Sequence, residues 1–247
     1  MSIFHPGDRT LTDLAVSLAG WKSGDKILDL GCGDGDTMRY LRDKYGLDPY
    51  GCDLDKNMVQ RALKADPSLR IRHTEGIELD YPSYFFDGAI MECSFSLMHR
   101  HDELLHELYC VLKPGARFVI ADLYCINPDF MRAERAYIGA KAILNRPRQE
   151  KDCEDSQQYP SPYILDGAFL QDKLIKAVRD VGFELVAFKD KTPELRDFYA
   201  QALMDYGSLD AFWAAELPEG SEPCNFCRVK PSKDVGYFVM AAEKKAK

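Results

Sequence analysis

Features that mark several protein classes are missing from this sequence of 247 residues. No apolar run reaches the roughly 18–20 residues of a membrane-spanning helix, so we expect no membrane span. The first ten residues, MSIFHPGDRT, lack the apolar core of a secretory signal peptide. Basic residues number 32 against 40 acidic ones, and the net charge of −8 argues against a nucleic-acid backbone as the main partner.

The cysteines also lack the pattern of a disulfide framework. Eight of them are scattered through a composition that is otherwise ordinary for the cytosol, which suggests reduced thiols. A hydrophobic content of 46% is enough for a real core, and the length fits one large domain over residues 1–247. We therefore predict a cytoplasmic protein and leave its oligomeric state open.

The most informative stretch runs from residue 26 to residue 41, with the sequence KILDLGCGDGDTMRYL. Its first five residues have the length and composition of a buried strand, and a glycine-rich loop and a helical pattern follow. Asp36 or Thr37 could cap that helix, because a short side-chain oxygen accepts one of its first N–H groups. Strand, glycine loop and helix are the entry unit of a nucleotide-binding α/β sheet.

The loop's own residues distinguish between ligands. A dinucleotide fingerprint needs glycine at the first, third and sixth positions, but counting from Gly31 the sixth position is Asp36. Asp29 and Asp34 add two more carboxylates, which would repel a pyrophosphate. This disfavours a nicotinamide-dependent oxidoreductase. S-adenosylmethionine (SAM) has no phosphate and carries a sulfonium, an ammonium and one carboxylate, and DLGCGDG resembles the first motif of the class I SAM-dependent methyltransferases.

Two further stretches support this resemblance. Asp53 lies 22 residues beyond Gly31, at the end of the predicted strand 49–53, where an acidic residue can accept hydrogen bonds from both ribose hydroxyls. Asp53 could instead cap the next helix, which Asp55 could do equally well. The run LKPGARFVIAD at 112–122 is similar to the family's turn into its fifth strand, where proline and glycine set the turn.

The resemblance implies an α/β fold, a Rossmann-like doubly wound sheet of seven mostly parallel strands with an antiparallel last strand and a helical cap. We assign residues 1–24 to an N-terminal helical segment, 25–123 to the SAM-binding half, and 124–165 and 194–234 to cap insertions on the substrate side. The helix of 10–20 either packs beside the sheet or continues an N-terminal segment, FHPGDRT, that folds over the cofactor.

The resemblance also implies a set of cofactor contacts. Glu75 fits the place where the family receives the exocyclic amine of adenine, with Glu78 as a competing candidate. Glu92, at the end of the predicted fourth strand, could approach the methionine amino group or a substrate cation, or could be a plain polar strand end. The predicted cofactor-binding residues are Asp29, Gly31, Cys32, Gly33, Gly35, Asp53, Leu54, Glu75, Gly76, Ile77 and Glu92.

The segment after the fourth strand is where the acceptor is expected to meet the methyl group. It reads Glu-Cys-Ser-Phe rather than the Asn- or Asp-Pro-Pro-aromatic of enzymes that methylate nucleobase amines. Phe95 could border the sulfonium, since a ring face attracts a cation, or could belong to the core. His99 is a possible general base because histidine titrates near neutral pH. The predicted substrate-side residues are Cys93, Phe95, Tyr124, Cys224 and Cys227.

We predict transfer of a methyl group from SAM to a small molecule, with S-adenosylhomocysteine as the product and no metal site. Cys93 supports a narrower alternative, because it stands where the arsenite methyltransferase branch carries a metalloid-binding cysteine. Soft thiolates suit such a ligand, but the paired upstream cysteines of that branch are missing. A SAM-binding module without catalysis is the other alternative, since it would keep the first half of the chain.

Overall fold

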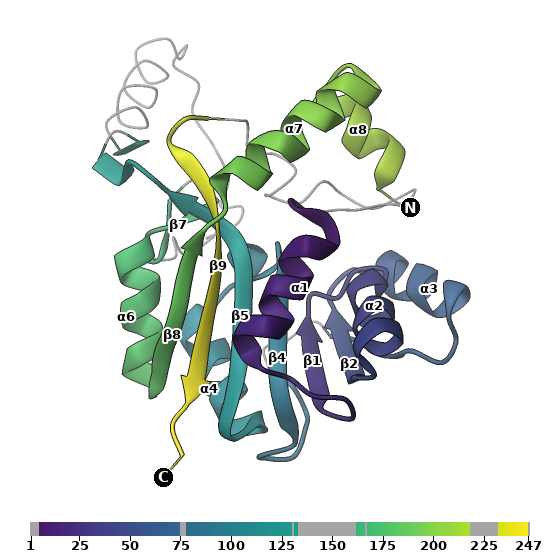
Figure 1. Ribbon diagram of the computed structural model, residues 1–247, viewed down its shortest axis with the longest axis vertical. Coiled ribbons are helices and arrows are strands. Elements are labelled where there is room, and N and C mark those ends of the chain that lie inside the picture. The colour runs from purple at the N-terminus through teal and green to yellow at the C-terminus, as the bar shows by residue number, and fades with distance from the viewer. Residues whose placement is uncertain are drawn as a thin grey trace, which may run out of the picture.

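The computed structural model describes residues 5–74, 78–129, 131–132, 162–165, 167–217 and 232–246. They form an α/β fold with one sheet and helices on both faces (Figure 1). The strands are β1 (Lys26–Leu30), β2 (Asp48–Asp53), β3 (Arg70–His73), β4 (Phe86–Glu92), β5 (Leu112–Cys125), β6 (Ile164–Leu165), β7 (Ala168–Phe169), β8 (Phe183–Asp190) and β9 (Val235–Lys244). The helices are α1 (Asp8–Ala19), α2 (Asp36–Tyr45), α3 (Lys56–Ala65), the 3-10 helix η1 (Phe95–Leu97), α4 (His101–Val111), α6 (Gln171–Val181), α7 (Thr192–Tyr206) and α8 (Leu209–Glu216).

The sheet has the predicted doubly wound order. Its parallel part runs β3-β2-β1-β4-β5. The last strand, β9, lies antiparallel between β5 and β8, as predicted. The carboxyl ends of the parallel strands β1, β2 and β4 therefore meet at one edge, and the strand order reverses between β1 and β4. In an open α/β sheet a ligand binds at such an edge.

The two faces of the sheet have separate cores. The first packs against α1, α7 and α8, and the second packs against α4 and α6. The hairpin of α7 and α8 follows β8 and lies above α1, beyond the end of the sheet where the parallel strands finish (Figure 1). Helix α8 and all but the first two residues of α7 fall in the predicted cap range 194–234, of which residues 218–231 lie outside the described part. Of the other cap range, 124–165, residues 130 and 133–161 lie outside it.

Three details differ from the sequence-based expectation. The described sheet has nine strands rather than seven, because the two-residue strands β6 and β7 extend it beside the end of β5. Strand β5 begins at Leu112, so the predicted turn of 112–115 lies within the strand. Neither Asp36 nor Thr37 caps α2. The N-cap is Gly35, and the Thr37 hydroxyl donates instead to Glu92 at 2.7 Å.

A substitution at Gly88 in β4 tests how closely Trp21, which follows α1, packs against the sheet. A Cβ at this position would lie 2.0 Å from Nε1 of Trp21 and 2.9 Å from the Arg117 carbonyl oxygen. We expect Gly88→Ala to lower the free energy of unfolding by about 1–3 kcal/mol, the usual cost of overpacking. Urea unfolding measures this loss.

Trp21 supplies an independent readout, because the chain has only two tryptophans. In a Trp213→Phe background, the emission of Trp21 should change on Gly88→Ala as the indole is displaced. Unchanged stability together with unchanged emission would contradict this packing.

Candidate active site

The first glycine of the loop is needed for a close approach between two segments. Gly31 has a φ of +79°, and a Cβ there would lie 2.4 Å from the Cβ of Ser94. The Ser94 hydroxyl donates to the Leu30 carbonyl at 2.6 Å, so the segment after β4 is fastened to the end of β1. The N–H groups of Gly31 and Cys32 donate to the Cys52 carbonyl at 2.8 and 3.1 Å. The loop is thus fixed on two sides.

The middle glycine leaves one face of the loop open. Gly33 has a φ of +52°, and among the residues that the structure describes, a Cβ there would meet only the terminal methyl of Met58, at 3.9 Å. Its N–H donates to Oδ2 of Asp53 at 2.7 Å. This bond fixes the loop to the end of β2 and leaves space beside the loop for a ligand.

Asp53 and Asp55 have different roles. The second oxygen of Asp53 accepts from the Asp55 N–H at 2.8 Å, and burial raises the pKa of the Asp53 carboxyl. Asp55 is the cap of α3, because its side chain accepts from the N–H groups of Asn57 at 2.7 Å and Met58 at 3.4 Å. The capping alternative for Asp53 is therefore excluded, which leaves Asp53 at the strand end beside the glycine loop.

Asp29 carries the strongest sign of a missing partner. The residue is only 3% exposed, and its Oδ2 has no hydrogen-bond partner among the described residues. Burial raises the pKa of the Asp29 carboxyl well above its usual value, and the nearby carboxylates of Glu92 and Asp53 raise it further. Three strands thus bring three carboxylates close together around the buried Asp29, an arrangement that a cationic ligand would stabilise.

Glu92 is held between the first two helices. One of its carboxylate oxygens accepts from the Thr12 hydroxyl of α1 at 3.0 Å, and the other accepts from the Thr37 hydroxyl of α2 at 2.7 Å. Nε2 of His5 lies 3.8 Å from the same carboxylate. Glu92 is therefore more than a polar strand end, since it joins α1 to the glycine-loop region.

These residues fit SAM better than a dinucleotide. The ribose hydroxyls can donate to a carboxylate such as Asp53, and the positive sulfonium and ammonium suit a site with buried carboxylates such as Asp29 and Glu92. The open face at Gly33 leaves room for the ligand. A pyrophosphate in the same place would lie among like charges.

Cys93 follows this site directly and has an unusual backbone. Its φ is +53°, a left-handed value that is uncommon outside glycine and concentrated at functional sites. The Cys93 N–H donates to the Ala121 carbonyl at 2.8 Å, and its Sγ lies 3.0 Å from the hydroxyl of Tyr237. Tyr237 is fully buried, and burial raises its pKa well above the usual value. The thiol and the phenol form one polar pair between β4 and β9.

The other predicted acceptor residues lie in different surroundings. Phe95 is fully buried and stacks on Phe169 with ring centroids 5.5 Å apart, which is a core position. His99 is exposed. The hydroxyl of the half-buried Tyr124 donates to Asp190 at 3.1 Å, near the start of α7. The structure thus brings Cys93 and Tyr237 together and gives Phe95 a packing role.

The structure describes three of the remaining predicted cofactor-binding residues. The Leu54 side chain is 68% exposed, and Cys32 is buried beneath the loop. A Cβ at Gly35 would lie 2.7 Å from the side chain of Leu69, so this glycine serves packing. The predicted site residues outside the described part are Glu75, Gly76, Ile77, Cys224 and Cys227.

Several residues of this region were not predicted from the sequence. Thr37 follows the glycine loop, and this position in the sequence could have indicated that its side chain lies near the ligand. Thr12 and Tyr237 carry no such signal, because each lies far along the chain from the segment that it contacts. Arg9 belongs to the segment FHPGDRT, but its pairing with Asp36 could not be predicted from the pattern.

Asp122 also belongs to this group, and it fastens the segment after β4. It is fully buried, and its two oxygens accept from the N–H and the hydroxyl of Ser96 at 2.8 and 2.7 Å. The Leu123 N–H donates to the same carboxylate at 2.8 Å. Because this segment continues from Cys93, Asp122 helps to fix the acceptor side of the site.

Comparison with known proteins supports the same class. Residues 28–120 match the family model described as a methyltransferase domain. Phosphoethanolamine N-methyltransferase 3 of Arabidopsis thaliana is 28% identical over 186 residues, which cover 72% of this chain and 33% of that protein. The 2-phytyl-1,4-naphtoquinone methyltransferase of Nostoc punctiforme is 29% identical over 185 residues, covering 71% of this chain and 79% of that protein.

A solved structure has the same fold. Phosphoethanolamine N-methyltransferase 2 of Haemonchus contortus, in complex with S-adenosyl-L-methionine, gives a TM-score of 0.70 at 17% identity, over 99% of this chain and 54% of that one. The chain thus has a Rossmann-like α/β fold. Its residues 28–120 match a methyltransferase domain, and the predicted resemblance to class I SAM-dependent methyltransferases is confirmed.

The chain differs in length from several of these relatives. The chain spans less than half the length of the plant phosphoethanolamine N-methyltransferases from Arabidopsis thaliana, Zea mays and Triticum aestivum, of which it covers 33%, 42% and 40%. In the part of the chain that the structure describes, no helix is both long enough and apolar enough to span a membrane.

The Asp122 carboxyl predicts a pH-dependent stability. Burial raises its pKa to about 6, and the hydrogen bonds from Ser96 only partly oppose this rise. Because the folded-state pKa lies above the ordinary 3.8, the folded state binds the proton more tightly. This contribution to stability is complete below about pH 4 and is lost as the pH rises through about 6. A pKa difference of about two corresponds to about 3 kcal/mol.

Unfolding in urea at several pH values tests this effect on wild type and Asp122→Asn. We expect the stability difference, wild type minus variant, to fall by up to about 3 kcal/mol between pH 4 and pH 7. A difference that stays constant over this range would contradict the assignment.

Proposed function

We propose that the protein is an enzyme that transfers a methyl group from SAM to a small-molecule acceptor, with S-adenosylhomocysteine as the product. The observation that carries this proposal is the group of three carboxylates beside the glycine loop, of which Asp29 is buried and Asp53 and Glu92 are half-buried. Burying like charges together costs free energy. A ligand with a sulfonium and an ammonium would offset that cost.

The residues have separate tasks in binding this cofactor. Asp53, fixed by the N–H groups of Gly33 and Asp55, accepts hydrogen bonds from the ribose hydroxyls. Asp29 and Glu92 face the positive groups of the methionine part. Glu75, Gly76 and Ile77 are proposed as the adenine contacts because of their place in the family pattern. SAM, when bound, supplies an electrophilic methyl group.

The acceptor side needs positioning more than acid–base chemistry. A displacement at a methyl carbon requires the acceptor atom at roughly 3–3.5 Å, in line, with water excluded. Cys93 directly follows Glu92 in the sequence and contacts Tyr237. We propose that this polar pair contributes to the acceptor side of the site. The exposed His99 remains our candidate for a base when the acceptor arrives protonated.

The acceptor is proposed as a small molecule without a closer name. One relative is named for phosphoethanolamine and another for a naphthoquinone, so amine and ring acceptors both occur among the matches. We further propose a cytoplasmic location and no nucleic-acid partner, because of the scattered cysteines and the net charge of −8. Cys93, together with Cys224 and Cys227, keeps a trivalent metalloid among the acceptors to be tested.

The function is tested with SAM labelled on its methyl group. The protein is incubated with a cell extract that is then split into small-molecule, protein and RNA fractions, and with arsenite in a separate sample. Label in the small-molecule fraction is the expected result. Label on arsenite that is lost in Cys93→Ser would instead support metalloid methylation as the function. Intact SAM binding without any labelled product would favour a binding module.

The ribose contact gives a sharper prediction. Asp53→Ala removes an acceptor for two charge-assisted hydrogen bonds, so SAM affinity should fall by about 2–4 kcal/mol, measured by calorimetry. The matched control is Asp55→Ala, two residues further on. That variant loses the cap of α3 and about 1 kcal/mol of stability, and it should keep its SAM affinity. Unchanged affinity in Asp53→Ala would remove Asp53 from the site.

A further inference from the structure

The site has carboxylates for the sulfonium and ammonium of SAM. The carboxylate of SAM itself needs a different partner. SAM ends in a carboxylate beside its ammonium. The loop and the strand ends around it hold five carboxylates, which would repel that group, namely Asp29, Asp34, Asp36, Asp53 and Glu92. A cation is needed at this end of the site if the proposed function holds.

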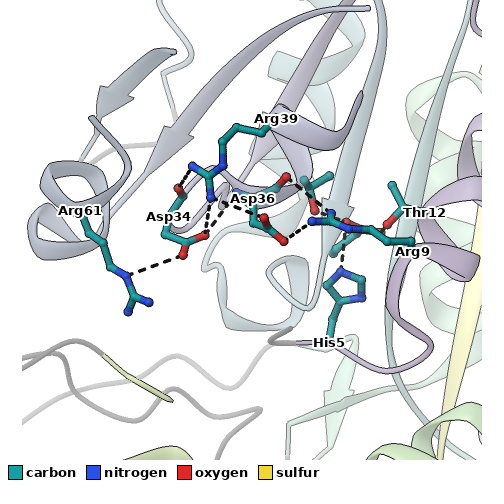
Figure 2. A network of polar contacts seen from close by, with 9 residues as sticks. His5, Arg9, Thr12, Asp34, Asp36, Arg39 and Arg61 are labelled. Atoms are coloured by element: carbon teal, nitrogen blue, oxygen red, sulfur yellow. Dashed lines mark hydrogen bonds and ion pairs between the residues drawn. The ribbon is translucent and has the colours of Figure 1, made fainter. Parts of the chain in front are cut away.

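Three arginines, Arg9, Arg39 and Arg61, lie around the glycine loop (Figure 2). Arg39 donates to the Asp34 carbonyl at 2.9 Å and to the Asp36 carboxylate at 3.5 Å. Arg61 links the loop to α8, because it lies 3.7 Å from Asp34 and donates to the Glu216 carbonyl at 3.3 Å. Its side chain is 40% exposed.

Arg9 differs from both. Its Nη2 pairs with the Asp36 carboxylate, and its guanidinium carbon lies 4.3 Å from the ring centre of Tyr40. Its Nε is buried and has no hydrogen-bond partner among the described residues. A buried N–H without an acceptor is costly, so native sites normally provide one. Of the three arginines, only Arg9 has such a buried N–H without a partner.

The place of Arg9 on α1 brings it to the methionine end of the site. Thr12 lies one helical turn further along α1 and donates to Glu92, while Asp36 directly follows the glycine loop. Figure 2 shows Arg9, Thr12 and His5 on one side of Asp36, with Arg39 and Arg61 on the other. Arg9 therefore lies where the loop, α1 and the end of β4 come together.

We propose that Arg9 binds the carboxylate of SAM, with its Nε–H as one of the donors, so that α1 completes the cofactor site. This inference rests on the proposed function. A guanidinium matches a carboxylate with parallel N–H donors, and Asp36 holds the guanidinium in place from its other side. The N-terminal helix then takes part in ligand recognition beyond covering the sheet.

Helix α1 stays attached to the domain without Arg9. Asp13 accepts hydrogen bonds from the hydroxyls of Tyr40 and Tyr45 at 2.7 and 2.6 Å and from Nζ of Lys44 at 2.7 Å. These contacts join α1 to α2 independently, and the apolar side of α1 packs into the core. A variant at position 9 should therefore fold.

The test compares two ligands that differ only in the carboxylate. Calorimetry measures the dissociation constants of SAM and of decarboxylated SAM for wild type, Arg9→Gln and Arg9→Lys. For wild type, we expect SAM to bind about 10- to 100-fold more tightly than decarboxylated SAM. Arg9→Gln should lose this preference by weakening SAM alone, and Arg9→Lys should keep part of it.

Arg39→Gln is the matched control, since it removes a neighbouring guanidinium and should weaken both ligands equally or not at all. Equal weakening of both ligands by Arg9→Gln would reduce Arg9 to a structural residue and overturn the inference. Unchanged binding of both would overturn it as well. If wild type binds neither ligand, the proposed function itself fails, which is a result distinct from the other two.

Discussion

The structure depends on the hydrogen bond between the Gly33 N–H and Asp53. This 2.7 Å bond joins the loop after β1 to the end of β2, and Asp53 is itself fixed by the Asp55 N–H. The loop keeps its left-handed glycines because strand ends hold it on both sides. The parallel pairing of β1 with β2 and β4 brings Asp29, Asp53 and Glu92 to the same edge, where a cationic ligand would stabilise them.

The first helix links the two halves of the site. Through Thr12 it holds Glu92, and through Arg9 it pairs with Asp36. Meanwhile the segment after β4 is fixed from beneath by Asp122 and from the side by Ser94. The backbone strain at Cys93 therefore occurs between two anchored neighbours, where surrounding contacts can maintain an uncommon conformation.

Local pattern was enough for much of the fold. The helix of 56–65 and the strand of 86–92 have the bounds or sequence features that the pattern indicated, because propensity, capping and hydrophobic period agree there. The two-residue strands β6 and β7 could not be predicted, since so short a pairing depends on what lies beside the end of β5. The predicted side-chain cap of α2 was wrong. The Thr37 hydroxyl donates to Glu92, 55 residues away, and does not bond to the backbone of its own helix.

The sequence by itself determined the ligand class and the glycine-loop residues, because a loop of glycines and carboxylates constrains its own backbone and its own charge. Only the tertiary structure decided which carboxylate is the cap and which lies at the loop, that Phe95 packs in the core, and that Tyr237 meets Cys93. The tertiary structure also decided that Arg9 pairs with Asp36. Such contacts join residues far apart in the chain, and no local pattern records which distant side chains the sheet order brings together.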